Sequence, residues 1–372
     1  MIKTRRQLMR EGAGLLAGGA MLGTPLLSCA EATSSSTGGQ VMKTLHIPAE
    51  EDAHAFCFMQ WPVSKKVYPD PVFLDMLQGS IAKVANAIND FEPVIITAAK
   101  EHHAAMKKQL AGNIEIWDIP TDDLWARDSG PVFAFDGNTP VVSGFNFNGW
   151  GNKQTHKNDG PMAKAVADRV GLTYMPSTLT GEAGGLEWDG KDTLLALESC
   201  WVNKNRNRGK SRDQITSELL AMYGAKNMIW SKGIKGEDIT DYHIDSLARF
   251  VKPGQVIIQL PEDDGSDNPW VTEPFDAYDI IEAAGMDMQV LPTPSKPRIK
   301  SDDFVASYVN YYIANGAIIG AQFGDKETDA EANALLKKLY PGREVISLNI
   351  DPIGEVGGGI HCATQQCPKG IV

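Results

Sequence analysis

The sequence is poor in cysteine, in net positive charge and in metal-binding spacings, and each shortage excludes a class of protein. Its 372 residues include 5 cysteines, which are too few and too widely spaced for a disulfide-stabilised fold. A formal net charge of −12 argues against a nucleic-acid-binding protein, which usually carries a basic face. No Cys-x-x-Cys or His-x-x-x-His spacing indicates a metal site. What remains is a large, acidic chain with ample apolar material for a core, since 42% of its residues are hydrophobic.

The N-terminal segment has the pattern of a bacterial export signal. Thr4-Arg5-Arg6-Gln7-Leu8-Met9 is a twin-arginine pattern. The weakly apolar run that follows is too short and too rich in glycine to span a membrane. We therefore expect residues 1–28 to be a twin-arginine signal peptide and residues 29–44 to be a flexible tether.

Two processing sites are open at the end of this signal. Leu26-Leu27-Ser28-Cys29 resembles a lipobox, in which Cys29 would carry a lipid, whereas Ala30-Glu31-Ala32 fits ordinary cleavage. The first alternative predicts anchoring to the cell envelope through Cys29, and the second predicts a free periplasmic protein.

From residue 45 onwards, short apolar stretches alternate with amphipathic helical patterns, which predicts an α/β fold. The expected helices span residues 71–88, 101–110, 161–170, 212–223, 274–284 and 328–339. The expected strands include residues 56–60, 94–97, 114–119, 193–197, 228–230, 256–260, 288–291 and 345–348. A dinucleotide-binding fold is excluded because no Gly-x-Gly-x-x-Gly follows a strand and opens a helix. No linker interrupts this part, so residues 45–372 are expected to form a single domain.

The most informative stretch lies near the C-terminus, where Cys362 follows the triplet Gly357-Gly358-Gly359. Glycines permit positive φ and a close approach to another group, so we expect a turn that presents an exposed thiol. A cysteine nucleophile also needs a base and an orienting group from distant parts of the chain.

Two upstream segments supply such groups: Asp128 lies in the first, at 125–131, and His243 and Asp245 lie in the second, at 241–245. Two carboxylates can hold a planar guanidinium by forked, charge-assisted hydrogen bonds, which makes the two aspartates a candidate guanidinium site. We expect Asp128 at a strand-to-loop edge, and His243 and Asp245 on one face of a strand. The histidine can protonate departing ammonia and then accept a proton from water.

Each of these motifs alone has an ordinary structural explanation, such as an ion pair, a helix cap or a tight turn. Their joint presence with a single C-terminal cysteine is what indicates chemistry. A papain-like protease is disfavoured, because it places its cysteine early and its histidine late in the chain.

With these residues considered together, the chain resembles agmatine deiminase and the related bacterial-type peptidylarginine deiminases, from Leu45 to Lys369. The matching segments are residues 47–50, 60–62, 125–131, 182–185, 189–190, 203–207, 307–310 and 358–366. The resemblance implies the pentein fold, in which five ββαβ modules form a pseudo-symmetric propeller around a central active site. It also implies hydrolysis of a guanidino group to a ureido group and ammonia, without a metal or a cofactor.

The resemblance assigns a role to each candidate residue. Cys362 is the nucleophile and His243 the acid/base. Asp128 and Asp245 bind the guanidinium, and Glu182 completes the catalytic set. The residues expected to line the substrate site are Trp125, Asn310 and Gly359.

Four further positions qualify this assignment. His361 is next to the nucleophile but on a different face, and it is expected to be structural. Glu51, Ala183 and Asp192 depart from the family pattern and concern the fit of the substrate rather than the chemistry.

The identity of the substrate stays open at this point. The leading hypothesis is agmatine, converted to N-carbamoylputrescine, and the alternative is peptidylarginine or free arginine, converted to citrulline. An arginine substrate needs a cation for its carboxylate, for which the candidates are Arg206, Arg208 and Arg249. A non-catalytic exported protein that binds guanidino compounds or polyamines is a third hypothesis, and a homodimer is a further expectation.

Overall fold

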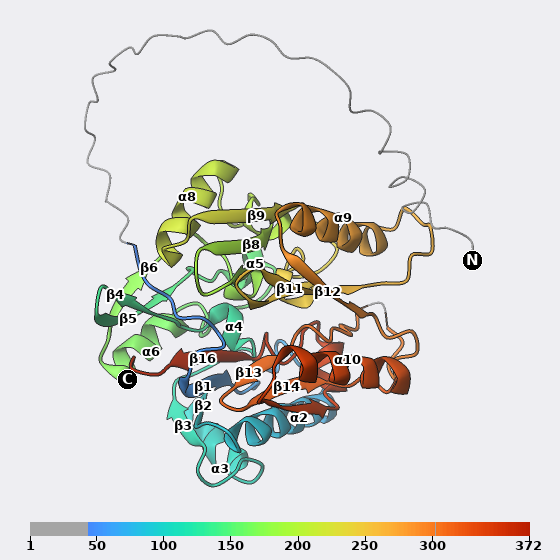
Figure 1. Ribbon diagram of the computed structural model, residues 1–372. Helices are drawn as coiled ribbons and strands as arrows, with labels where there is room; N and C mark the ends of the chain where they lie inside the picture. The colour runs from blue at the N-terminus through green and yellow to red at the C-terminus, as the bar shows by residue number, and fades with distance from the viewer. Residues whose placement is uncertain (1–43, 302) are drawn as a thin grey trace, which may run out of the picture.

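The computed structural model describes residues 44–301 and 303–372 (Figure 1). The predicted signal peptide, Cys29 and all of the predicted tether except Thr44 lie outside the described residues. Within the described part of the chain, no helix has both the length and the apolar character that crossing a bilayer requires.

Four modules of one design follow one another along the described chain. In each module an antiparallel hairpin is followed by a helix and by a third strand, which pairs in parallel with the second strand of the hairpin. The modules are β4 (Val132–Asp136), β5 (Thr139–Gly144), α6 (Met162–Val170) and β6 (Thr173–Pro176); β7 (Leu186–Trp188), β8 (Thr193–Leu197), α8 (Arg212–Tyr223) and β9 (Asn227–Ser231); β10 (Ala248–Lys252), β11 (Gln255–Leu260), α9 (Pro269–Ala283) and β12 (Asp287–Pro292); and β13 (Tyr312–Ala314), β14 (Ala317–Ala321), α10 (Lys326–Leu339) and β15 (Glu344–Leu348).

The fifth module is assembled from both ends of the chain. Its hairpin position is filled by the last strand, β16 (Thr364–Pro368), which pairs antiparallel with β1 (His54–Gln60). Helix α2 (Pro71–Asn89) then leads to β2 (Val94–Ala98), which is parallel to β1, and β3 (Glu115–Asp118) extends the sheet. Figure 1 shows the red β16 next to the blue β1. This arrangement of five ββαβ units confirms the predicted α/β pentein fold.

Helix α2 illustrates how the sequence specifies these elements. The Asp70 side chain accepts a hydrogen bond from the Val72 N–H, and Pro71 occupies the first turn, where its missing N–H costs nothing. The apolar residues then recur at helical spacing and are buried against the neighbouring strands; they are Leu74, Leu77, Ile81, Val84, Ala85 and Ile88. The helix ends at Asn89, one residue beyond the predicted end.

Three expectations about secondary structure need correction. The predicted helix at 101–110 is a 3-10 turn, Lys100–His102, followed by the four-residue α3 (His103–Met106). Helix α9 begins at Pro269 and not at Pro274, because Asn268 caps it and Pro269 occupies the first turn, which leaves Pro274 inside the helix. The strands β4, β5, β6, β7, β10 and β16 are absent from the prediction, since several of them are short and carry polar side chains.

Helix α2 also provides a test of packing. Leu77 is fully buried, whereas the adjacent Met76 is 52% exposed on the opposite face. We expect Leu77→Ala to lower the free energy of unfolding by about 2–5 kcal/mol, because it leaves a cavity in the core. Met76→Ala should change it by less than about 0.5 kcal/mol. Equal effects of the two substitutions in urea denaturation would contradict this packing of α2.

Candidate active site

The candidate site residues share one position in the repeat: each precedes the first strand of a module. Asp128 lies in the short helix α4 (Ala126–Ser129) before β4, and Glu182 precedes the 3-10 turn η3 (Ala183–Gly185) before β7. The remaining members are His243 and Asp245 before β10, Asn310 before β13 and Cys362 before β16. The structure brings these segments into contact, with α4 against η3 and η3 against the turn η4 (Ile244–Ser246).

Two expectations about local geometry are wrong. Asp128 is not at a strand-to-loop edge but within helix α4, and neither His243 nor Asp245 lies on a strand. The three side chains nevertheless face one gap above Gly184. A Cβ atom at Gly184 would lie 2.7 Å from Asp128 Oδ1, 3.0 Å from His243 Nδ1 and 3.2 Å from Asp245 Oδ2. Two carboxylates and an imidazole therefore converge on the point where a side chain at residue 184 would begin, and only glycine allows this approach.

The thiol of Cys362 is buried, so the expectation of an exposed thiol is also wrong. Its Sγ atom lies 3.2 Å from Asn310 Nδ2 and 3.4 Å from Asp245 Oδ2. The glycine triplet explains the burial. Gly357 has a φ of +91°, and a Cβ at Gly358 or Gly359 would overlap the Trp125 ring or the Asn310 amide, respectively. The glycines thus pack the loop tightly instead of projecting it into solvent.

Electrostatics at the thiol favour the protonated form. Burial raises the pKa of the Cys362 thiol well above its ordinary value, and the carboxylates of Asp245 and Asp128 raise it further. Burial likewise raises the pKa of Asp128 to about 6. A cation placed in the gap above Gly184 counteracts these effects and favours the thiolate.

His243 is held between two acidic side chains. Its Nε2 lies 3.2 Å from Glu182 Oε2, and its Nδ1 lies 3.7 Å from Asp128 Oδ1. Burial alone lowers the pKa of this imidazole, but the carboxylates of Asp128 and Glu182 outweigh it and raise the pKa to about 9. The ring is therefore an imidazolium at neutral pH and can act as a proton donor.

Two buried arginines pair with carboxylates of the site. Neither guanidinium is free to bind the carboxylate of an arginine substrate. Arg206 Nε lies 2.9 Å from Glu182 Oε1, and its Nη1 lies 2.8 Å from Asp241 Oδ2. Although burial favours the neutral acid, Arg206 holds the pKa of Glu182 below its ordinary value. Arg249 is paired with Glu187 at 2.6 Å and with Glu50.

Glu50, Glu187 and His361 resemble a metal-binding cluster, because one ligand atom from each lies within 4.8 Å of the others. Two guanidiniums already pair with these groups, however: Arg249 contacts both glutamates, and Arg127 Nη1 lies 2.9 Å from Glu50 Oε1. The cluster is therefore neutralised by arginine and does not call for a metal ion.

Trp150 is a site residue that the sequence reasoning missed. Its indole N–H donates to Asp128 Oδ2 at 2.9 Å, and its ring packs edge-on against Phe147. The backbone is left-handed at Trp150, with φ +53°, between two glycines of the same conformation. Such a conformation is unfavourable for a bulky residue and is concentrated at functional sites. The flanking glycines of Gly149-Trp150-Gly151 were the available signal.

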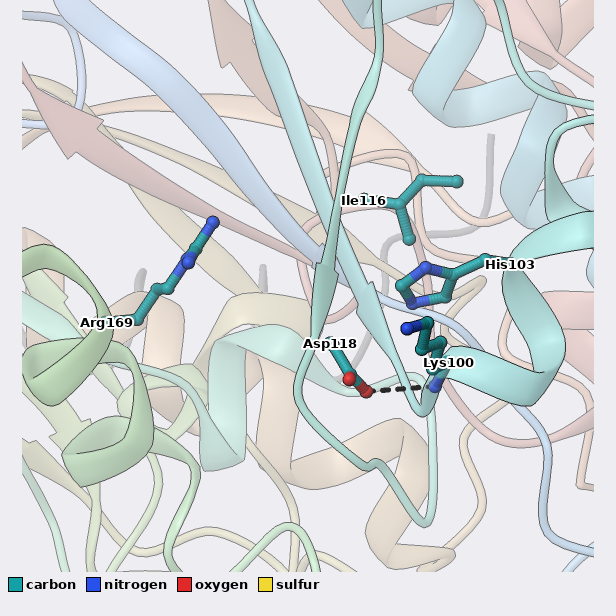
Figure 2. A pocket seen from close by; sticks show the side chains of 5 residues that line it. All are labelled: Lys100, His103, Ile116, Asp118 and Arg169. Carbon is teal, nitrogen blue, oxygen red and sulfur yellow. Dashed lines mark hydrogen bonds between the residues drawn. The ribbon is translucent and has the colours of Figure 1, made fainter.

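A separate hollow of about 260 Å³ lies away from this site, at the end of β3 near α6 (Figure 2). It is lined by Lys100, His103, Ile116, Asp118 and Arg169. Asp118 accepts a hydrogen bond from the Lys100 N–H, and the Arg169 guanidinium lies over the Trp117 ring. Its polar groups are thus engaged in local contacts, and none of the candidate catalytic residues faces it.

Comparisons with known proteins agree with this geometry. Residues 46–368 match the family of Porphyromonas-type peptidyl-arginine deiminases. The chain is 32% identical to an agmatine deiminase of Medicago truncatula, over 87% of this chain and 96% of that protein. A C. jejuni agmatine deiminase with substrate bound is 25% identical, with a TM-score of 0.80 over 87% of this chain and 96% of that one. A Porphyromonas gingivalis structure, provisionally named an arginine deiminase, is 27% identical, with a TM-score of 0.77 over 88% of this chain and 99% of that one.

The burial of the thiol predicts its reactivity. We expect iodoacetamide to alkylate Cys362 slowly at pH 7 in the ligand-free protein, because the thiolate is disfavoured. Asp128→Asn removes one of the nearby negative charges and should accelerate the labelling several-fold. Peptide mapping by mass spectrometry distinguishes Cys362 from Cys57, Cys200 and Cys367. Labelling of the unmodified protein as fast as that of a free cysteine would rule this arrangement out.

Proposed function

Because the chain belongs to the family of Porphyromonas-type peptidyl-arginine deiminases, we propose that it hydrolyses agmatine to N-carbamoylputrescine and ammonia. The observation that carries this proposal is the gap above Gly184. Two carboxylates and an imidazolium line it, and the Cys362 thiol lies 3.4 Å from one of the carboxylates.

The first half of the reaction transfers the amidino group to the enzyme. Asp128 and Asp245 hold the guanidinium, and its positive charge favours loss of the Cys362 thiol proton to solvent, which leaves the thiolate. The sulfur attacks the central carbon and forms a C–S bond. His243 protonates one amino group, which leaves as ammonia when its C–N bond breaks. The product of this half is a thiouronium adduct on Cys362.

The second half consumes one water molecule. The imidazole of His243, now neutral, accepts a proton from water while the water oxygen bonds to the same carbon. The C–S bond then breaks and the remaining hydroxyl proton passes to the sulfur, which releases the ureido product and restores the Cys362 thiol. Glu182 stabilises the imidazolium in both halves through its contact with His243 Nε2.

The buried arginines favour agmatine over arginine as the substrate. An arginine substrate carries a carboxylate that needs a cationic partner, whereas agmatine does not. Arg206 and Arg249 are buried and already paired with glutamates, so neither is free for that role. Arg208 is exposed at the surface, and the provisional name of the P. gingivalis relative keeps an arginine substrate as the second candidate.

We also propose that the protein is exported by the twin-arginine route and resides in the periplasm or on the envelope through Cys29. The support is the sequence of residues 1–32 alone. A homodimer stays a prediction, which gel filtration with light scattering would test.

The proposed activity has a direct test in product analysis by mass spectrometry. Purified residues 31–372 are incubated in parallel with agmatine, free arginine and a peptide with an internal arginine. We expect replacement of NH by O in agmatine and loss of all turnover in Cys362→Ala. Conversion of arginine or the peptide without conversion of agmatine would replace the proposed substrate. Binding without turnover of any of them would favour the non-catalytic alternative.

The pairing of His243 with Glu182 predicts the pH dependence of the reaction. The imidazolium is the proton donor, so kcat/KM should fall as the pH rises through the pKa of His243, about 9. Glu182→Gln removes a carboxylate that raises this pKa, so the alkaline limb should move to lower pH. Glu218→Gln, which removes an ion pair with Lys210 elsewhere, should leave the limb in place and serves as the control. An unchanged limb in Glu182→Gln would contradict the assignment of the proton donor.

A further inference from the structure

The side chain of His361 has no part in the reaction as described, yet both of its ring nitrogens contact carboxylates. Nδ1 lies 2.8 Å from Asp245 Oδ2, and Nε2 lies 3.0 Å from Glu50 Oε1. We propose that His361 is a positioning residue: its Nδ1–H donates to Asp245 Oδ2 and orients this guanidinium-binding oxygen. The inference rests on the proposed function and assigns to His361 more than the structural role expected of it.

A single carboxylate oxygen of Asp245 contacts three parts of the site. Oδ2 receives His361 Nδ1, lies 3.4 Å from Cys362 Sγ and lies 3.2 Å from the Cβ position above Gly184. The same atom therefore faces the nucleophile, the guanidinium gap and the histidine. Without the imidazole this fully buried carboxylate loses its closest hydrogen-bond donor and becomes free to turn away from the gap.

Glu50, on the Nε2 side of the ring, is itself fixed from two sides. Arg127 Nη1 and Arg249 Nη2 both contact its carboxylate. The backbone N–H of Arg127 also donates to the carbonyl of Cys362 at 3.0 Å. The catalytic loop, the N-terminal segment and β10, which carries Arg249, are thus joined at this point.

The single ring proton of His361 stabilises Asp245 more than it would stabilise Glu50, because Asp245 has fewer other donors. Glu50 already has two guanidinium donors, whereas the other contacts of the Asp245 oxygens are the Cys362 thiol and the Ser246 hydroxyl at 3.5 Å. Although burial favours the neutral acid, His361 lowers the pKa of Asp245. The charged and titratable groups that face Asp245 are His361, His243, Arg249, Cys362, Asp128 and Glu187.

A matched pair of substitutions separates the two contacts of His361. In His361→Asn the amide nitrogen takes the place of Nδ1 and can still donate to Asp245. In His361→Gln the amide nitrogen takes the place of Nε2 and reaches only Glu50. The two variants resemble each other in polarity and differ in which carboxylate keeps a donor.

We expect His361→Asn to retain kcat/KM within about fivefold and His361→Gln to lose about 10- to 100-fold, as for a lost hydrogen bond to a charged group. In His361→Gln the pKa of Asp245 rises, so the acid limb of the kcat/KM profile should move to higher pH. In His361→Asn that limb should stay in place. Equal losses in both variants without a shift, or no loss in either, would overturn the proposal.

A second readout does not depend on turnover. In His361→Gln, the carboxylate of Asp245 is free to turn away from the thiol, so iodoacetamide should label Cys362 faster at neutral pH than in the unmodified protein. His361→Asn should label at the unmodified rate. If His361→Gln does not fold, His361→Ala takes its place with the same expectations. Unmodified protein that converts none of the guanidines would refute the proposed function, whereas equal labelling rates in all variants would refute the role of His361.

Discussion

The centre of this molecule depends on keeping several carboxylates ionised where water is excluded. Four carboxyl groups are buried or partly buried there: those of Asp128, Glu182, Asp245 and Glu50. A buried charge without a partner is strongly unfavourable. Imidazole and guanidinium groups from other segments of the chain pair with these carboxylates and compensate their charge. Because His243 meets Asp128 and His361 meets Asp245 across module boundaries, correct charging of the site depends on correct packing of the modules.

The repeat explains how one site can draw on so much of the sequence. The segment before the first strand of each module ends at the same place relative to its sheet, so five repeats deliver five short segments to a common centre. This position, and not the face of a strand, is what unites Asp128, His243 and Cys362. The absence of side chains at Gly184, Gly358 and Gly359 then lets these segments approach one another closely.

The sequence predicted α2 from its apolar periodicity, the strand Thr193–Leu197 from its continuous apolar run, and helix α8, which a capping box at Ser211 begins. It missed strands such as β7 and β16, whose polar residues are buried only because distant neighbours cover them. The catalytic candidates came from motifs and from a family resemblance, and the structure brings them together. Partners such as Glu50 and Trp150 could not be found in that way. Glu50 is 311 residues from His361, and nothing local in its segment signals the contact.

The pairing of β16 with β1 has a consequence for the synthesis and folding of the chain. A polypeptide that emerges from the ribosome with its N-terminus first has β1 but lacks β16 and the nucleophile until the four modules between them have been made. Contacts of such long sequence separation also form late in folding, because a large loop must close before they are made. A chain that stops before β16 therefore cannot assemble the thiol with its carboxylates, so the centre forms only after all five modules have been made and folded.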